Sequence, residues 1–284
     1  MGMQTRSLFN KIREAQKLYH LQDYTRAFNM LSDVEKKTDN LHLKTKIANL
    51  KIQCLFQVGN VKSAVEYIEE LTSIYPLSGQ INFLAASVYR KLGDLIKAGR
   101  LYLRSVCLYP ENTQYALVYS QFLKESNRTS EAIGIIRNSL KKQKEIGGSD
   151  SGTYFLYLEL ALSYYLMGYF SRSLVFFTKC ASSSKNFPYY DLISEIYLKK
   201  NEPQKAKNFI EKHLNYWGEG DPDALFIYAK VLVSLNDKAN AIKYLRKCEK
   251  LWGELVVTSG DMTHLFPLLQ DGSLKKIKNL VLEL

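Results

Sequence analysis

Residues 79–112, GQINFLAASVYRKLGDLIKAGRLYLRSVCLYPEN, decide the fold of this chain. Two small residues, Ala86 and Ala98, stand on either side of Gly93 and Asp94. Glycine tolerates the left-handed conformation that ends a helix, and an aspartate can cap the helix that follows. The stretch therefore predicts two helices joined by a tight turn.

The same arrangement recurs along the chain at intervals of 33–41 residues. A first-helix column of mostly small residues contains Ala15, Ile52, Ala86, Ser120, Ala161, Ser194 and Ala229. A second-helix column, twelve residues further on, contains Ala27, Ala64, Ala98, Ala132, Ser173, Ala206 and Ala241. Small side chains let two antiparallel helices approach to about 8–10 Å. Each unit is therefore expected to be a hairpin packed through these two columns.

Turn residues and large apolar residues keep the same register. The turns begin at Gln22, Gly59, Gly93, Asn127, Gly168, Asn201 and Asn236, and six of these seven are Gly or Asn. Large residues follow the second-helix column by four places, at Leu31, Ile68, Tyr102, Ile136, Phe177, Ile210 and Leu245. Residues four apart share one face of a helix, so these side chains are expected to fill the core.

On these residues the chain resembles the tetratricopeptide repeat family. The family pattern is a small residue, a large residue, Gly, an aromatic, Ala, an aromatic and Pro. Residues 79–112 carry it best, through Ala86, Tyr89, Gly93, Leu95, Ala98, Tyr102 and Pro110. The closing Pro is absent from the first unit and from the fourth to the seventh, and Gln22 replaces the first Gly. The resemblance covers roughly residues 8–252.

The resemblance implies an all-α, right-handed superhelical solenoid of about seven helix-turn-helix units followed by a C-terminal capping helix. Four units are expected within residues 8–146 and three within 154–252. Residues 147–153 are rich in Gly and Ser, which predicts either a surface loop or a hinge between two lobes. Residues 253–284 are expected to form the capping segment, because the last unit of a solenoid exposes an apolar face.

The capping segment carries its own alternative. Ser273 can begin a helix in which Leu274, Ile277 and Val281 recur at near-helical spacing. The helix is expected to cover the last repeat, and the alternative is self-association or partner binding through these three residues.

The sequence contains no pattern typical of an enzyme or of a metal site. The four cysteines lie far apart without a C-x-x-C pair, which predicts free thiols in a reducing compartment. The four histidines stand at no metal-ligand spacing, and glycine-loop and nucleophile motifs are missing. We therefore expect no catalysis, cofactor or metal.

Apolar runs stay short of the roughly 18 residues that span a bilayer. The first residues lack an apolar stretch of signal-peptide length, so a cytoplasmic location is expected. The net charge of +11 is spread along the chain rather than gathered in one block.

The family resemblance also implies a site, because the first helices of such units line a concave groove that holds partners. The groove column is then Gln16, Asn49, Phe83, Leu117, Leu158 and Phe226. Neighbouring positions add Tyr19, Gln53, Phe56, Ser87, Arg90, Gln121, Lys124, Tyr165 and Lys230. Amides can bond a peptide backbone, and Arg90 with Lys124 favours acidic side chains. The alternative for the aromatic residues is packing between repeats.

The resulting functional hypothesis is a scaffold or adaptor that binds a peptide or helix of a partner protein, alone or within a larger complex. Two alternatives remain. The first is nucleic-acid binding by a basic solenoid, which Asp191 and Glu195 disfavour because they interrupt the groove with negative charge. The second is self-assembly through the C-terminal helix.

Overall fold

The computed structural model describes residues 3–147, 150–183 and 189–258, and every regular element in these ranges is an α-helix. The chain divides between Gly148 and Ser149 into two compact units, which we call the N-terminal unit and the C-terminal unit. The expected capping helix with Leu274, Ile277 and Val281 lies outside the described residues.

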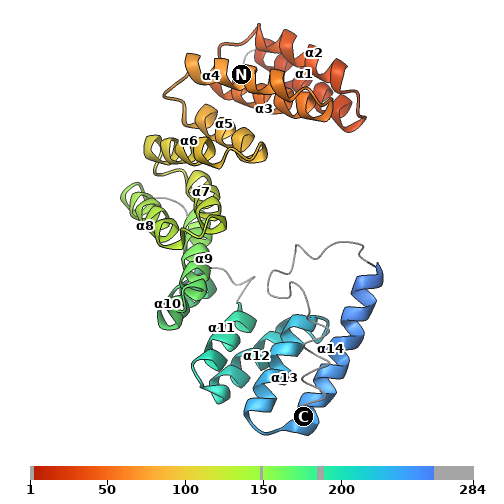
Figure 1. Ribbon diagram of the computed structural model, residues 1–284, viewed down its shortest axis with the longest axis vertical. Helices are drawn as coiled ribbons and strands as arrows, with labels where there is room; N and C mark the ends of the chain where they lie inside the picture. Colours follow the sequence, from red (N-terminus) through yellow and green to blue (C-terminus); the bar gives the residue numbers. More distant parts are fainter. Residues whose placement is uncertain (1–2, 148–149, 184–188, 259–284) are drawn as a thin grey trace. The chain divides into compact units, whose positions relative to one another are not determined.

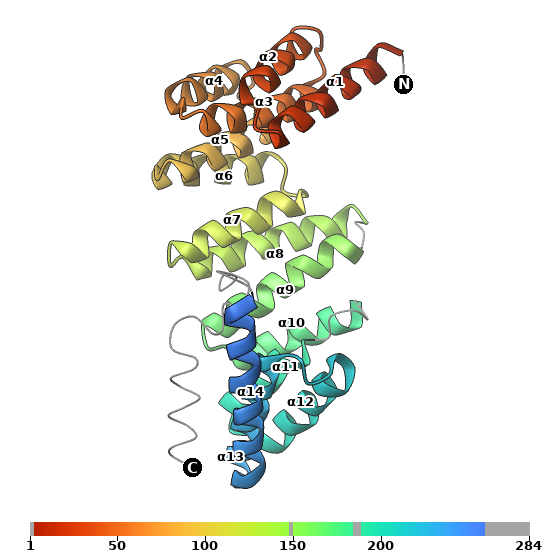
Figure 2. The same cartoon turned by 90° about the vertical axis from the view of Figure 1, so that its right-hand side faces the viewer.

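The N-terminal unit consists of four helical hairpins (Figures 1 and 2). Its helices are α1 (Met3–His20), α2 (Tyr24–Glu35), α3 (Leu41–Gln57), α4 (Val61–Ile74), α5 (Gly79–Lys91), α6 (Leu95–Leu108), α7 (Thr113–Glu125) and α8 (Thr129–Glu145). Each hairpin therefore coincides with one of the repeats expected from the sequence.

The C-terminal unit adds three hairpins within the described residues (Figure 2). Its helices are α9 (Asp150–Leu166), α10 (Phe170–Ser183), α11 (Tyr190–Lys199), α12 (Pro203–Trp217), α13 (Pro222–Ser234) and α14 (Lys238–Thr258). Helix α9 begins at Asp150, inside the stretch 147–153 that was expected to form a loop or hinge. Gly152 costs a helix about 1 kcal/mol relative to Ala, and the complete burial of Leu156 and Leu160 further along α9 offsets that cost.

The turn inside each described hairpin has one residue in the left-handed region. These residues are Gln22 (φ 63°), Gly59 (76°), Gly93 (81°), Asn127 (59°), Gly168 (75°), Asn201 (59°) and Asn236 (62°). The residue that follows returns a hydrogen bond to the end of the first helix; Asp94 N–H, for example, donates to Tyr89 O at 3.0 Å. This 6→1 bond satisfies a carbonyl that the helix end would otherwise leave unpaired.

Both small-residue columns are buried in the hairpins. Every residue of the second-helix column is 0% exposed, and the first-helix column ranges from 0% to 3%. Ile52 is the one large residue in either column. Its hairpin, α3 with α4, has the smallest number of closely spaced residues between its two helices among the described hairpins. Side-chain volume in these columns therefore governs how closely two helices pack.

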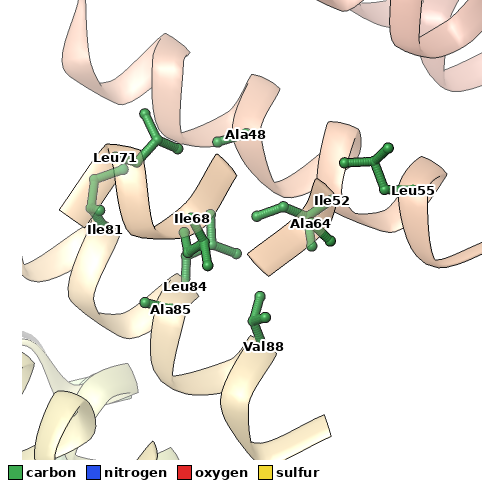
Figure 3. Close-up of a cluster of buried hydrophobic side chains, with 10 residues drawn as sticks. All are labelled: Ala48, Ile52, Leu55, Ala64, Ile68, Leu71, Ile81, Leu84, Ala85 and Val88. Carbon is green, nitrogen blue, oxygen red and sulfur yellow. The ribbon is translucent and has the colours of Figure 1, made fainter. Parts of the chain in front are cut away.

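Within each unit, hairpins stack because the second helix of one packs against the first helix of the next. Figure 3 shows this between α4 and α5, where Ile68 lies against Leu84. The cluster comprises Ala48, Ile52, Leu55, Ala64, Ile68, Leu71, Ile81, Leu84, Ala85 and Val88 from α3, α4 and α5. The core is therefore continuous from one repeat to its neighbour, as expected for a solenoid.

A buried ionic network joins the first two hairpins. Lys51 on α3 is 6% exposed, and its Nζ lies 2.7 Å from Glu35 Oε2 on α2. The ammonium group also lies 4.1 Å from the ring centroid of Tyr67 and 4.9 Å from that of Phe28. Tyr67 donates its hydroxyl proton to the second oxygen of Glu35. The charge of Lys51 is thus compensated by a carboxylate and two aromatic faces.

Candidate functional site

The first helices of three successive hairpins border a hollow of about 280 Å³ in the N-terminal unit. Helices α3 and α5 provide most of its lining, and α7 contributes one residue. The lining residues are His42, Thr45, Lys46, Asn49, Gln80, Phe83, Leu84, Ser87 and Tyr115. We call this hollow the groove site.

Aromatic rings form the floor of the groove site. Phe83 stacks on Tyr115 with ring centroids 4.8 Å apart, and it meets Tyr102 edge-on at 5.5 Å. Ser87 Oγ lies 3.2 Å from Tyr102 Oη and 3.1 Å from Phe83 O. Phe83 therefore fits both alternatives that the sequence left open for the aromatic residues, because it packs between repeats and also lines the hollow.

Amide and hydroxyl groups form the rim. Gln80 is held between α3 residues, with its Oε1 3.3 Å from Thr45 Oγ1 and its Nε2 3.5 Å from His42 Nδ1. Asn49 Oδ1 accepts a hydrogen bond from Gln53 Nε2 at 3.4 Å, a contact that does not use the amide protons of Asn49. These contacts fix two amide side chains at the edge of the hollow.

Lys46 is the cation of the groove site. Its side chain is exposed on α3 and forms no ion pair with any residue that the structure describes. Within this hollow, Lys46 is therefore the group that can bind a carboxylate without first breaking an internal ion pair.

Arg90 is positioned differently. Its Nη2 lies 2.7 Å from both carboxylate oxygens of Glu125 on α7, and Gln121 Nε2 donates to the same carboxylate at 3.3 Å. Arg90 and Gln121 are thus brought together, around a carboxylate of the chain itself. A partner carboxylate at this position would have to displace Glu125.

The other predicted groove residues lie outside the lining of the hollow. Gln16 is exposed on α1, and Tyr19 Oη accepts a hydrogen bond from Gln57 Nε2 at 3.3 Å. Phe56 is half-buried, with Lys91 Nζ 4.2 Å from its ring centroid. Lys124 is half-buried on α7 and has partners of its own within the protein.

Tyr165 belongs to the C-terminal unit. It lies on α9, and Lys199 Nζ lies 5.2 Å from its ring centroid. Burial and the nearby carboxylate of Glu195 raise the pKa of its hydroxyl. Lys230 Nζ is 3.9 Å from Glu195 Oε1, so these side chains form a polar cluster on the first helices of this unit.

Several lining residues were not predicted from the sequence, although the positions of two of them carry a usable signal. Lys46 and Gln80 each stand three residues before a predicted groove residue, Asn49 and Phe83. Residues three apart share a helix face, so extending each groove position by three would have found them.

A titratable cluster lies in the C-terminal unit. Nearly buried His213 on α12 places Nε2 3.2 Å from Asp221 Oδ2 and Nδ1 3.6 Å from Asp191 Oδ1. Asp221 also caps α13 by accepting from the N–H groups of Asp223 and Ala224. Burial, and then the neighbouring Asp221 and Asp191, raise the pKa of Asp223 to about 7.

This cluster does not amount to a metal centre. Across the described residues, no group of three His, Cys, Asp or Glu side chains is arranged to hold a metal ion. None of the described helices is long and apolar enough to cross a membrane.

Comparison with known proteins agrees with this architecture. Residues 222–251, which cover α13 and the first part of α14, match the family model of the tetratricopeptide repeat. None of the curated proteins matches the chain. The predicted resemblance to this family is confirmed, and no particular member is indicated.

Solved structures show the same fold at low sequence identity. A tetratricopeptide repeat protein from Parabacteroides merdae ATCC 43184 is 15% identical over 98% of this chain and 99% of that chain, with a TM-score of 0.55. PilW, a widely conserved type IV pilus biogenesis factor, is 15% identical over 82% of this chain and 98% of its own, with a TM-score of 0.57. Pseudomonas aeruginosa pilF is 17% identical over 83% and 97%, with a TM-score of 0.56.

Proposed function

We propose that this tetratricopeptide-type solenoid is a protein-interaction scaffold that binds an extended, acidic peptide segment of a partner protein at the groove site. The observation that carries the proposal is the chemistry of the hollow between α3, α5 and α7. It joins an aromatic floor to two fixed amides and one exposed ammonium group.

Each part of the groove site has a role in this proposal. The stacked rings of Phe83 and Tyr115 receive an apolar or aromatic side chain of the peptide. The amide protons of Asn49 donate to a peptide carbonyl, as polar groups do in peptide-binding grooves. Lys46 binds a carboxylate next to the anchoring side chain.

The size of the groove site supports a peptide rather than a small metabolite. Its volume of about 280 Å³ lies at the lower limit of small-molecule pockets, which are roughly 300–1,000 Å³. A hollow of this size accommodates one anchoring side chain while the rest of the peptide follows the open helical surface. This is a binding role, and we propose no catalysis.

We also propose that the protein works in the cytoplasm. Support comes from the four cysteines, which are unpaired and include the buried Cys54, Cys180 and Cys248. Free buried thiols are common in reducing compartments, where disulfides are rare.

The test is a selection of peptides from a random phage-displayed library on the full chain. Selected peptides should contain an apolar anchor beside Asp or Glu. Lys46→Glu should shift the selection towards Lys and Arg, and Asn49→Ala should weaken the selected peptides by about tenfold.

Lys141→Glu is the matched control, because Lys141 is exposed on α8 away from the groove site. It makes the same charge change and should leave the selected sequences and their affinities unaltered. The proposal fails if no peptide is enriched, or if Lys46→Glu binds the same acidic peptides as tightly as the parent chain.

A further inference from the structure

A second uncovered surface lies on α6, the second helix of the third hairpin. Leu95, Ile96 and Leu103 are 52%, 73% and 43% exposed. They recur along one side of the helix because residues 95, 99 and 103 are four apart, and Ile96 borders the same side. Apolar side chains gathered in this way usually mark an interaction site.

These residues border a hollow of about 370 Å³, which α7 and the turn between α7 and α8 complete. Tyr119 and Phe122 of α7 form its floor. Gly99 of α6 lies in its wall, and a Cβ at that position would stand 3.2 Å from Phe122 Cε1. The missing side chain at Gly99 therefore lets the ring of Phe122 pack close to the α6 backbone, and both residues line the hollow beside Leu95 and Leu103.

The charges that α6 contributes to this surface are all positive, while Arg128 at the far rim is paired with Glu131 at 2.7 Å. Helix α6 carries Lys97, Arg100 and Arg104 but no acidic residue. Lys97 is paired with Glu69 at 2.7 Å. Arg100 and Arg104 are exposed and form no ion pair with the described part of the chain. Two unpaired guanidinium groups thus lie one helical turn apart beside the apolar stripe.

We infer that α6, with α7 and the turn that follows it, docks an acidic amphipathic helix of a partner protein. Apolar side chains of that helix cover Leu95, Ile96 and Leu103, and one of them enters the hollow over Tyr119 and Phe122. Carboxylates spaced four residues apart on the partner helix face Arg100 and Arg104, which bind carboxylates in two-pronged geometry. The surface shares no lining residue with the groove site, so the inference stands independently of the proposed function.

The shape of the surface favours a helix over a lipid membrane. A hollow with an aromatic floor accepts a projecting side chain, in the way that the ridges of one helix enter the grooves of another. A bilayer surface offers no such projection. A single docked helix buries less area than a permanent complex requires, so we expect a reversible interaction.

The experiment uses two designed, fluorescein-labelled helical peptides with the same leucine stripe. One carries Glu and the other Lys at the flanking positions. In fluorescence anisotropy with the full chain, the Glu peptide should bind at least about tenfold more tightly than the Lys peptide. Ile96→Gln combined with Leu103→Gln should weaken the Glu peptide by about tenfold. Arg100→Glu should reduce the preference for the Glu peptide.

The matched control combines Ile74→Gln with Leu77→Gln. These side chains are 56% and 68% exposed at the end of the second hairpin, so the control removes comparable apolar surface elsewhere. It should leave both affinities unchanged. The Lys46→Glu chain should also bind the Glu peptide normally, which separates this surface from the groove site.

Cys107 provides a footprint of the docked peptide. It is the one exposed cysteine of the four, and it follows Leu103 by one helical turn on α6. A saturating Glu peptide should slow its alkylation by N-ethylmaleimide, measured by mass spectrometry of the intact chain. The inference is overturned by equal binding of the two peptides, by binding without protection of Cys107, or by no binding. If the parent chain binds phosphatidylserine vesicles and only the variant with Ile96→Gln and Leu103→Gln loses that binding, the surface is a membrane-binding site instead.

Discussion

Ser173 Oγ donates a hydrogen bond to the main-chain carbonyl of Ala161 at 2.7 Å, across the two helices of one hairpin. In the next hairpin Ser194 Oγ donates to Ala206 O at 2.8 Å. In both hairpins the serine stands in one small-residue column and its acceptor stands in the other. A serine can replace alanine there because the facing backbone satisfies its hydroxyl group.

Ser173→Ala is therefore expected to cost little, about 0.5–1.5 kcal/mol of unfolding free energy, because one hydrogen bond is lost and no cavity opens. Ser173→Leu should cost more, roughly 1–3 kcal/mol, because the larger side chain forces α9 and α10 apart. Urea denaturation followed by circular dichroism measures both. The exposed neighbour Ser171 supplies the control: Ser171→Leu should change stability by less than about 0.5 kcal/mol. Equal losses for both leucine variants would contradict the packing role of the column.

Gln22→Gly is expected to stabilise the chain. Gln22 has a φ of 63° and an exposed side chain, so it carries the cost of a left-handed conformation without a compensating contact. Glycine removes that cost, and the unfolding free energy should rise by about 0.5–1 kcal/mol. The control is Gln16→Gly in the interior of α1, where the same substitution should lower it by about 1 kcal/mol. A loss of stability with Gln22→Gly would show that the side chain has a structural role.

Lys51 and Glu35 should be energetically coupled in their contribution to the stability of the fold. Lys51→Met leaves the half-buried carboxylate of Glu35 without its cation, so a loss of about 2–4 kcal/mol is expected, less than for a fully buried pair. Adding Glu35→Leu removes the stranded charge and should recover part of that loss. A double-mutant cycle should give a coupling of about 2 kcal/mol. The exposed pair Lys62 and Glu66 on α4 is the control, since its cycle should give less than about 0.5 kcal/mol. Similar coupling in both cycles would contradict the importance of burial.

The repeat register could be predicted because it follows from local rules. Gly and Asn end helices through their own backbone preferences, and the small columns need only constant spacing. Gln22 adopts the same left-handed conformation although it is neither Gly nor Asn. Only its position in the repeat identified it as a turn residue. The beginning of α9 was less predictable, because Gly and Ser favour a loop locally while burial of the following apolar residues favours a helix.

The groove site was predictable only in part. The family resemblance predicted Asn49, Phe83 and Ser87 as groove residues, and these three line the hollow. It could not show that Glu125 neutralises Arg90, because their 35-residue separation brings them together only after the repeats stack. The same limit applies to α6. The sequence shows that Ile96 is apolar, but only the structure shows that its side chain is 73% exposed.

The acidic cluster of the C-terminal unit should make stability depend on pH through Asp223. Burial and the neighbouring Asp221 and Asp191 raise its folded-state pKa to about 7, from a value of 3.8 without these surroundings. The folded chain therefore binds a proton in this range that the unfolded chain releases. The stability associated with that proton is complete below pH 3.8 and is lost as the pH rises through about 7.

Asp223→Asn keeps the shape of the side chain and removes its titration. The free energy of unfolding of the variant should increase relative to that of the parent chain as the pH rises from 5 to about 7. Above that pH, the difference between the two chains should level off. Asp223 is partly exposed at the start of α13, where the helix dipole favours its charged form, so we expect a final gain of roughly 1–3 kcal/mol rather than the full value of the shift. Because Asp191 and Asp221 remain in both chains, most of their own contribution cancels in the comparison. Urea denaturation at pH 5, 6, 7 and 8 measures the difference, and Asp33→Asn, at an exposed position of α2, should show none. A constant difference between Asp223→Asn and the parent across this range would mean that Asp223 is ionised in the folded protein throughout, and would contradict the raised pKa of Asp223.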